Sequence, residues 1–290
     1  MPADVTYLGA GAVRELAARL GVRPTKTWGQ NFVVDANTVK RIVRLGQVGP
    51  DDVVLEIGPG LGSLTLGLAA EAAAVYAVEI DPVLAAALPG TLAAYAPARA
   101  DRVHVLAQDA LTLTDLPQPP TRVVANLPYN VAVPVVLHVL GRFPTIERVM
   151  VMVQLEVAER LAAPPGSRTY GAPSVKAAWY GHARLAGTVP RSVFWPVPNV
   201  DSGLVSVDRQ APPTAPVARE EVFAVVDAAF AQRRKMLRSA LARMAGSPAA
   251  AAVALEAAGV DPTLRGEQLD VAAFARVAAS LRHMGPVVHG

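Results

Sequence analysis

The 290-residue sequence contains no cysteine, which excludes disulfide bonds and thiolate metal sites. Its five histidines are scattered without the spacing of metal ligands, so we expect no bound metal. The start of the chain lacks a basic segment followed by an apolar core, and no apolar run is long enough to span a bilayer. These absences favour a cytoplasmic protein.

The sequence also has only a small excess of charge of one sign. The sequence has 27 basic and 24 acidic residues, a balance too mild to indicate a nucleic-acid partner by itself. Apolar residues are plentiful, at 52% of the chain, enough for the core of one large and one small domain. Three prolines between Gln210 and Ala218 predict a linker. We therefore place the first domain in residues 1–210 and the second in residues 211–290.

A short apolar segment, Val53–Ile57, runs into the glycine-rich stretch Gly58–Ser63. This pattern predicts a buried parallel strand that turns into a helix, with glycines that let the backbone approach a ligand. A dinucleotide site has glycines at the first, third and sixth positions of such a turn. Here Ser63 occupies the sixth position, which argues against NAD or FAD. The acidic Glu56 suits a positively charged ligand such as S-adenosylmethionine, although a helix-capping turn without a ligand fits this segment too.

Three further apolar segments end in polar residues. Val75–Glu79 ends in an acid well placed to accept hydrogen bonds from ribose hydroxyls. Val103–Leu106 leads to Asp109, which is able to accept from an adenine amino group. Val123–Ala125 runs into Asn126–Tyr129, where an amide oxygen, a carbonyl and an aromatic ring suit a planar base with an exocyclic amine.

A proline-rich segment near residue 195 holds two adjacent aromatic residues, Phe194 and Trp195. Prolines stiffen the segment and set the orientation of its side chains. With Tyr129, Phe194 predicts a base held between two rings, and such stacking contributes roughly 1–3 kcal/mol per base. Either residue can instead be an ordinary core residue. We favour the core for Trp195 and the base for Phe194.

Together these segments resemble the KsgA family of ribosomal RNA adenine dimethyltransferases. The resemblance runs from about Thr25 to Leu281 and keeps the order of the family. Each motif occurs in other methyltransferases, but the ordered set is specific. The segments that carry it are Gly29–Phe32, Glu56–Thr65, Glu79–Asp81, Asn126–Tyr129 and Gln232–Lys235.

The resemblance implies an α/β fold of the class I S-adenosylmethionine-dependent methyltransferase type, which is Rossmann-like. Its seven-stranded, mostly parallel sheet ends in an antiparallel hairpin. Strands alternate with helices from Val53 to Arg209, as expected for a doubly wound sheet. A small all-helical domain follows, in which apolar spacing predicts one helix over Phe223–Met244.

The resemblance also implies S-adenosylmethionine as the cofactor and assigns residues to the site. The expected cofactor contacts are Asn31, Val33, Gly58, Gly60, Glu79, Ile80, Asp109, Ala110 and Asn126. The expected catalytic residues are Asn126, Leu127, Pro128, Tyr129 and Phe194. In this arrangement the Asn126 side chain and the Leu127 carbonyl accept hydrogen bonds from the target amine, so that its lone pair points at the methyl group.

The implied reaction is dimethylation of N6 on two adjacent adenosines near the 3′ end of small-subunit (16S) ribosomal RNA, in ribosome biogenesis. We expect a monomer acting on an assembly intermediate of the 30S type. Four cations within six residues favour contact with RNA phosphates, unless one or two of them pair with acids of the catalytic domain. These four residues are Arg233, Arg234, Lys235 and Arg238.

Two alternatives remain. One is a resistance-type methyltransferase of large-subunit (23S) RNA, which shares the motifs. The long Pro164–Gly171 loop and the Gln232–Lys235 segment look more like the small-subunit group. The other is a non-catalytic RNA-binding assembly factor, and the intact Asn126–Tyr129 motif speaks against lost catalysis.

Overall fold

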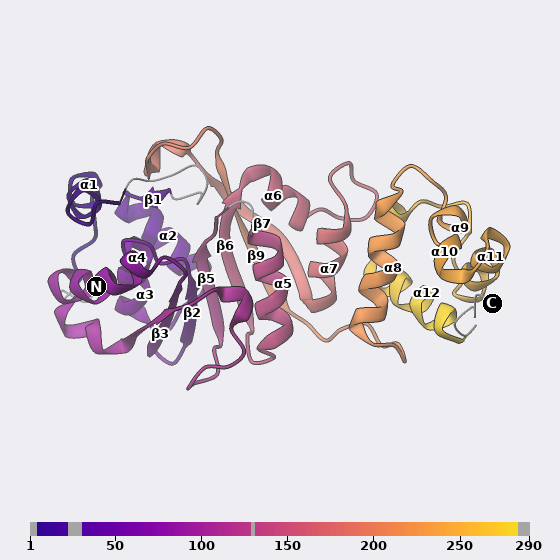
Figure 1. Ribbon diagram of the computed structural model, residues 1–290, viewed down its shortest axis with the longest axis horizontal. Coiled ribbons are helices and arrows are strands. Elements are labelled where there is room, and N and C mark those ends of the chain that lie inside the picture. Colours follow the sequence, from indigo (N-terminus) through magenta and orange to yellow (C-terminus); the bar gives the residue numbers. More distant parts are fainter. Residues whose placement is uncertain (1–4, 23–30, 129–130, 284–290) are drawn as a thin grey trace. The chain divides into compact units, whose positions relative to one another are not determined.

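The computed structural model describes residues 5–22, 31–128 and 131–283 (Figure 1). The chain divides into two compact units. The first consists of the described parts of Met1–Glu159 and Arg184–Arg209, and the second of those of Arg160–Ala183 and Gln210–Gly290. The second unit therefore includes a segment, Arg160–Ala183, that a single division at residue 210 assigns to the first domain.

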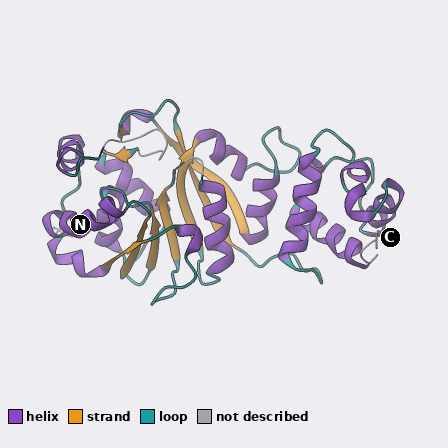
Figure 2. Ribbon diagram, in the orientation of Figure 1, coloured by secondary structure: helices purple, strands orange, loops and turns teal. Residues whose placement is uncertain are grey.

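Seven strands form the central sheet, in the order β4-β3-β2-β5-β6-β9-β7 (Figure 2). The pairs from β4 to β6 are parallel, and β6 pairs antiparallel with β9. This topology confirms the predicted fold class. The strands are β2 Val53–Ile57, β3 Ala74–Glu79, β4 Val103–Ala107, β5 Arg122–Asn126, β6 Arg148–Gln154, β7 Gly181–Val189 and β9 Ser202–Arg209.

Burial on both faces explains why the central strands are continuous apolar runs and do not alternate between apolar and polar residues. All six residues of β3 and the first six of β6 are buried, whereas no residue of the edge strand β4 is fully buried. Strands of parallel sheets show this pattern because their crossover helices cover both faces.

Helices pack against the sheet in two core clusters. One contains Ile42 of α2, Leu68 of α3 and Val124 of β5. The other contains Leu16 of α1 and Leu88 of α4. The helices up to α6 are α1 Ala10–Arg19, α2 Ala36–Leu45, α3 Ser63–Glu71, α4 Pro82–Tyr95, α5 Ala132–Arg142 and α6 Leu155–Leu161, with short 3₁₀ helices η2 Pro97–Arg102, η3 Ala110–Thr112 and η4 Arg191–Val193.

A separate two-stranded sheet ties the N-terminal segment to the segment that precedes β9. β1 (Phe32–Val33) pairs antiparallel with β8 (Phe194–Trp195), and the Val34 N–H donates to the Val193 carbonyl at 2.8 Å. The two strands are far apart in the sequence and have two residues each, so local patterning does not predict them. Their pairing brings the N-terminal segment to the carboxyl ends of the central strands.

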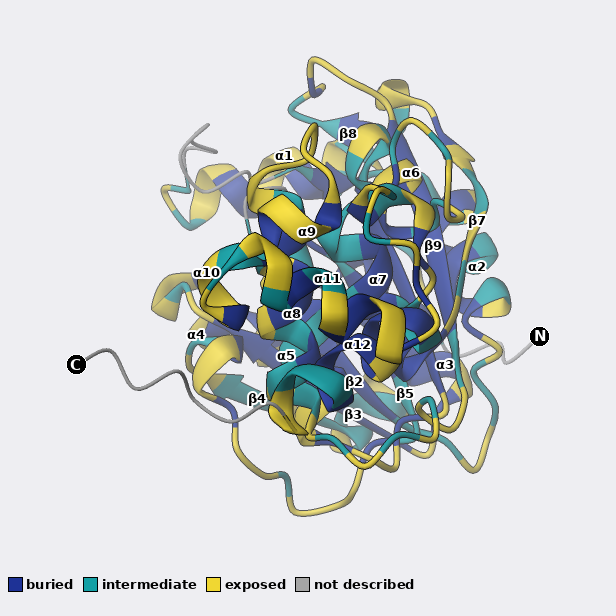
Figure 3. Ribbon diagram, turned by 90° about the vertical axis from the view of Figure 1, so that its right-hand side faces the viewer, coloured by how far each residue is buried: buried dark blue, intermediate teal, exposed yellow. Residues whose placement is uncertain are grey.

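The second unit is helical, as the resemblance implies. Phe274 is fully buried at its centre, and its ring centroid lies 6.1 Å from that of Phe230. Figure 3 shows exposed residues on the outer sides of α9 and α11. No helix in the described part of the chain is long and apolar enough to cross a membrane. The helices of this unit are α7 Ala172–Tyr180, α8 Arg219–Ala231, α9 Leu237–Ala240, α10 Ala242–Ala245, α11 Pro248–Ala257 and α12 Val271–His283, with η5 Gly266–Gln268.

The predicted single helix over Phe223–Met244 is wrong. α8 ends at Ala231, a turn follows over Gln232–Lys235, and α9 begins at Leu237. A hydrogen bond to another segment replaces a helical one here, because the Leu237 N–H donates to the Leu264 carbonyl at 2.7 Å. The apolar spacing continues past the turn since Leu237 is buried in the same core.

Gly203 of β9 lies directly against α6. A Cβ atom added to Gly203 lies 2.4 Å from the Ala158 Cβ, so strand and helix must separate to admit it. We expect Gly203→Ala to destabilise the fold by about 1–3 kcal/mol. Gly90 is the matched control, because it is an exposed helical residue with no atom within 4 Å of an added Cβ. Gly90→Ala should stabilise the fold by about 0.4–1 kcal/mol. Urea unfolding measures both, and equal effects would contradict the close contact.

Candidate active site

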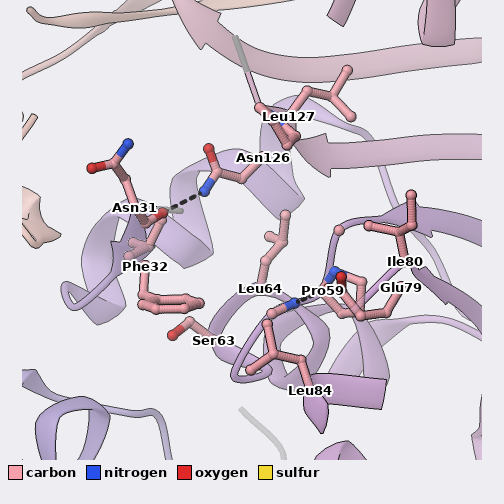
Figure 4. A pocket seen from close by; sticks show the side chains of 14 residues that line it. Asn31, Phe32, Pro59, Ser63, Leu64, Glu79, Ile80, Leu84, Asn126 and Leu127 are labelled. Atoms are coloured by element: carbon pink, nitrogen blue, oxygen red, sulfur yellow. Dashed lines mark hydrogen bonds between the residues drawn. The ribbon is translucent and has the colours of Figure 1, made fainter. Parts of the chain in front are cut away.

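A cleft lies at the carboxyl ends of the central strands, where the strand order reverses. From β2 the chain continues to β3 and β4 on one side, and then to β5 and β6 on the other. Ligands of open α/β sheets bind at such a switch point. The cleft holds about 760 Å³ of empty space, its open mouth included (Figure 4). Its lining residues are Asn31, Phe32, Val33, Gly58, Pro59, Gly60, Ser63, Leu64, Glu79, Ile80, Leu84, Asn126, Leu127 and Pro128.

The turn after β2 brings backbone to the wall of this cleft. Gly58 and Gly60 have φ angles of +69° and +57°, in the left-handed region that favours glycine. A Cβ atom on Gly60 would lie 2.9 Å from the Phe32 ring, so glycine also lets that ring lie over the turn. α3 begins at Ser63, and its first residues, Ser63 and Leu64, line the cleft.

Glu79 presents an oriented carboxylate at the end of β3. Its Oε2 accepts a hydrogen bond from the Gly60 N–H (Figure 4), and its Oε1 accepts one from the Asp81 N–H, both at 3.0 Å. Each oxygen keeps a lone pair for another donor. Burial raises the pKa of Glu79, and the two backbone donors oppose that rise. Glu79 is therefore a fixed pair of acceptors, suited to a diol.

Asn126 lies at the end of β5, with its amide oriented by the N-terminal segment. The Asn126 Nδ2 donates to the backbone carbonyl of Asn31 at 2.9 Å (Figure 4). A carbonyl oxygen can only accept, so the amide nitrogen must face Asn31 and the amide oxygen must face elsewhere. Within the described residues, the Asn126 Oδ1 accepts no hydrogen bond. The oxygen is thus available to the donor of a ligand.

The next two residues add an acceptor without a donor. The Leu127 N–H donates to the Met152 carbonyl at 3.0 Å, which fixes this backbone beside β6. Pro128 has no N–H, and it restricts the preceding residue to extended conformations. The Leu127–Pro128 peptide therefore offers a carbonyl and no amide hydrogen, which suits an amine. Tyr129, the next residue of the motif, lies outside the described residues.

Glu56 is not among the residues that line the cleft. The sequence had suggested that its negative charge faces a cationic ligand. Glu56 is 1% exposed, and burial raises its pKa from 4.5 to about 8, opposed by the Thr65 hydroxyl and assisted by the negative charge of Glu79. The carboxyl group is therefore mostly protonated at neutral pH. Its Oε2 and the Ser63 Oγ are buried without a hydrogen-bond partner among the described residues.

Phe194 is not among the residues that line the cleft, and its contact with a base stays a prediction. The side chain is 2% exposed and belongs to the core cluster that contains Leu204. Trp195 is half-buried, and its ring centroid lies 6.4 Å from that of Phe32 in a stacked arrangement. Successive residues of a strand point to opposite sides, so the register that pairs Phe194 with Val33 directs Phe194 into the core.

Asp109 and Ala110 follow β4 but are not among the residues that line the cleft. The Asp109 Oδ1 accepts from the Leu111 N–H at 2.9 Å and so begins η3. Ala110 is buried.

Five residues that sequence reasoning left unassigned do line the cleft: Phe32, Pro59, Ser63, Leu64 and Leu84. Phe32 ends the motif that begins at Gly29, and Ser63 ends the glycine-rich turn, so both stand within recognisable segments. Leu84 carries no local signal, because it is one apolar residue among many in α4.

The four predicted RNA contacts belong to the second unit. Arg234, Lys235 and Arg238 are exposed. Arg233 is paired, since its Nε donates to the Glu267 carboxylate at 3.0 Å. The acid belongs to the same unit, not to the catalytic domain. No group of three potential metal ligands occurs among the residues that the structure describes.

The sheet order, the glycine turn after β2 and the acid after β3 define a class I methyltransferase. The crystal structure of the 23S rRNA methyltransferase ErmE matches 87% of this chain and 100% of its own, with a TM-score of 0.66 and 29% identity. A dimethyladenosine transferase from Plasmodium falciparum matches 88% of this chain and 98% of its own, with a TM-score of 0.73 and 20% identity. The second likeness shows the shared fold.

The family model described as ribosomal RNA adenine dimethylase matches residues 22–283, and the chain belongs to that family. It is 64% identical over 277 residues to a Thermobifida fusca protein named ribosomal RNA small subunit methyltransferase A, across 95% of this chain and 96% of that protein. A Streptomyces coelicolor protein of the same name is 64% identical over 279 residues, across 96% and 98%. These findings confirm the resemblance and the enzyme class, an rRNA adenine dimethyltransferase.

Glu56 should make the stability of the fold depend on pH. Its pKa rises from 4.5 to about 8 on folding, so folding takes up a proton between these values. Stability that is present below the lower value is lost as pH rises toward the upper one. At about 1.36 kcal/mol per pKa unit, the loss at pH 7 is roughly 3 kcal/mol. The neutral variant Glu56→Gln should escape this loss.

Urea unfolding of the ligand-free protein at pH 5 and pH 8 tests this expectation. Glu56→Gln should gain over wild type at pH 8 and much less at pH 5. Glu15→Gln, at an exposed position of α1, is the matched control and should change little at either pH. A gain of equal size at both pH values would contradict the raised pKa.

Proposed function

We propose that this chain transfers methyl groups from S-adenosylmethionine to N6 of two adjacent adenosines near the 3′ end of small-subunit (16S) ribosomal RNA. Its family and its 64% identity to proteins named ribosomal RNA small subunit methyltransferase A support the target. The observation that carries the chemistry is the Asn126 amide. Its nitrogen is held by Asn31, and its oxygen is left to accept from the target amine.

A large-subunit target has less support. ErmE, whose name gives 23S rRNA, shares 29% identity with this chain, against 64% for the Thermobifida fusca protein named for the small subunit. A non-catalytic role is also disfavoured, because Asn126 and Leu127 both line the cleft with acceptors suited to an amine.

The residues of the cleft fit S-adenosylmethionine. Glu79 offers two oriented oxygens to the ribose hydroxyls, and Gly60 allows close approach of the backbone. Ile80, 51% exposed, offers an apolar surface to the adenine ring. The Ser63 Oγ has no partner within the described residues and provides a polar atom in the cleft wall. When bound, the cofactor supplies an electrophilic methyl group.

Asn126 and Leu127 prepare the amine for transfer. The N6 lone pair of adenine is delocalised into the ring, which makes the amine a weak nucleophile. Hydrogen bonds from its two N–H groups to the Asn126 Oδ1 and the Leu127 carbonyl favour a pyramidal nitrogen with its lone pair directed at the methyl group. No strong base is needed, because methylation makes the nitrogen cationic and acidic and its proton then passes to solvent. Tyr129 stacks on the base and holds it.

The RNA reaches this site as part of a small-subunit assembly intermediate of the 30S type, which a monomeric enzyme meets in the cytoplasm. The target base must be unpaired or flipped out of its stack before it can enter the cleft. Exposed cations of the second unit, Arg234, Lys235 and Arg238, contact the RNA phosphates.

Glu79→Ala should weaken S-adenosylmethionine binding by about 10- to 150-fold, the loss of a charge-assisted hydrogen bond of about 1.5–3 kcal/mol. Because burial raises the pKa of Glu79, wild-type affinity should fall as pH is lowered through that raised pKa. The variant should lack this dependence. Calorimetric titration between pH 5 and 8 measures both effects, with Asp101→Ala as an exposed control. An unchanged affinity in Glu79→Ala would remove Glu79 from the site.

Asn126→Ala should slow methyl transfer by about 100-fold or more, and change RNA affinity by less than about 3-fold, because its acceptor matters most as the amine becomes cationic. Asn126→Asp should not restore the rate, since one carboxylate oxygen would meet the Asn31 carbonyl. Single-turnover assays on small-subunit particles, with mono- and dimethyladenosine resolved by mass spectrometry, measure the rates. Near wild-type transfer by Asn126→Ala would overturn the mechanism.

A further inference from the structure

The loop between α6 and α7 has an internal structure of its own. The N–H and the hydroxyl of Ser167 donate to the Pro164 carbonyl, at 3.2 and 2.8 Å, and the Tyr170 N–H donates to the Ser167 carbonyl at 3.2 Å. Tyr170 is 2% exposed, and its hydroxyl donates to the Leu269 carbonyl at 2.8 Å. The loop is therefore folded on itself and anchored to the second unit by a buried side chain.

Arg233 fastens this loop to the turn after α8. Its Nη2 donates to the Arg168 carbonyl at 2.6 Å, and its Nε donates to the Glu267 carboxylate at 3.0 Å. Glu267 closes the arrangement, because its own carbonyl accepts from the Gly166 N–H at 2.7 Å. In Figure 1 the loop before α7 and the turn after α8 lie side by side. We call this arrangement, residues 164–170 with residues 232–236 and Glu267, the loop–turn surface.

The loop–turn surface carries unneutralised positive charge. Arg168, Arg234 and Lys235 are exposed, and within the described residues their side chains have no ion pair or hydrogen-bond partner. The acid of this surface, Glu267, already neutralises Arg233. Cations gathered in this way repel one another unless an anion lies among them, and a nucleic-acid backbone supplies anions at regular intervals.

None of the bonds that hold the loop uses the Arg168 side chain. Arg233 donates to the Arg168 carbonyl, and the remaining bonds involve other backbone groups, the Ser167 hydroxyl and the Tyr170 side chain. The guanidinium group is thus held at the surface without a structural task. Arg233 is the opposite case, since two of its nitrogens are committed to partners within the unit.

We propose that the Pro164–Gly171 loop is an RNA-binding element, in which Arg168 contacts a phosphate of ribosomal RNA beside Arg234 and Lys235. Arg233 acts as a positioning residue that holds the loop in place with Glu267. This inference rests on the proposed function, because it takes ribosomal RNA as the partner. It separates the predicted cationic segment into residues that contact RNA and one that arranges them.

The salt dependence of RNA affinity tests the contact. Arg168→Ala should lower the slope of log affinity against log salt concentration by about 0.7–0.9, the value for one lost phosphate contact, and Arg234→Ala should do the same. Arg168→Lys should keep the slope. Arg282→Ala, at a half-exposed arginine of α12, removes the same charge from the same unit and should leave the slope unchanged. A wild-type slope for Arg168→Ala overturns the proposal.

Glu267→Ala tests the positioning role. The result differs according to whether Glu267 only reduces the positive charge of the surface or also holds the loop in place. Removing an acid from a cationic surface should by itself raise RNA affinity. If Glu267 and Arg233 hold the loop, the variant loses hydrogen-exchange protection over residues 164–170, and Arg168→Ala then has little further effect on the slope. Arg234→Ala should still act additively in the Glu267→Ala background. Full additivity of Glu267→Ala with Arg168→Ala would overturn the positioning role.

The same experiments distinguish failure of this inference from failure of the proposed function. The full-length wild-type protein is first assayed for binding and methylation of small-subunit particles. If it does neither, the proposed function fails. If it does both, and Arg234→Ala lowers the slope while Arg168→Ala does not, the loop alone is excluded from the RNA-binding surface.

Discussion

The hydrogen bond from the Asn126 amide to the Asn31 carbonyl decides what the cleft can do. A free side-chain amide can turn its nitrogen or its oxygen to a ligand, but this one has its nitrogen committed at 2.9 Å. Asn31 is held in turn because β1 pairs with β8, and β8 is anchored by Phe194 in the core. A side chain at the mouth of the site is thus oriented through a backbone link to the core. The resulting surface accepts hydrogen bonds and suits an amine.

The strands that sequence reasoning placed correctly follow from local patterns. Val53–Ile57 forms β2, and Glu79 and Asn126 stand at the ends of their predicted strands. A parallel sheet brings such strand ends together without further information. Other features can be placed only with tertiary knowledge. Which ring, Phe194 or Trp195, enters the core depends on the register with β1, and the break after α8 depends on a bond to Leu264.

Two acidic residues near the cleft both have raised pKa values, but they differ in their hydrogen-bond partners. Glu79 accepts two backbone N–H bonds, which favour its ionised form and oppose the effect of its burial. Glu56 is enclosed near that charge with an oxygen that lacks a partner among the described residues, and its pKa of about 8 leaves it mostly neutral. A ligand therefore meets the two oriented oxygens of Glu79 at the end of β3, beside a Glu56 side chain that is mostly neutral.

The acceptor-only surface of Asn126, Leu127 and Pro128 has a consequence for how the proposed reaction ends. Adenine begins with two N–H groups at N6, each able to donate to one acceptor. The first methyl replaces one of these donors and the second replaces the other. One acceptor therefore loses its partner at the first methylation and the other at the second, so the dimethylated base has no donor left. Release of the dimethylated base then needs no additional residue, because this base has lost the hydrogen bonds that held its precursor in the cleft.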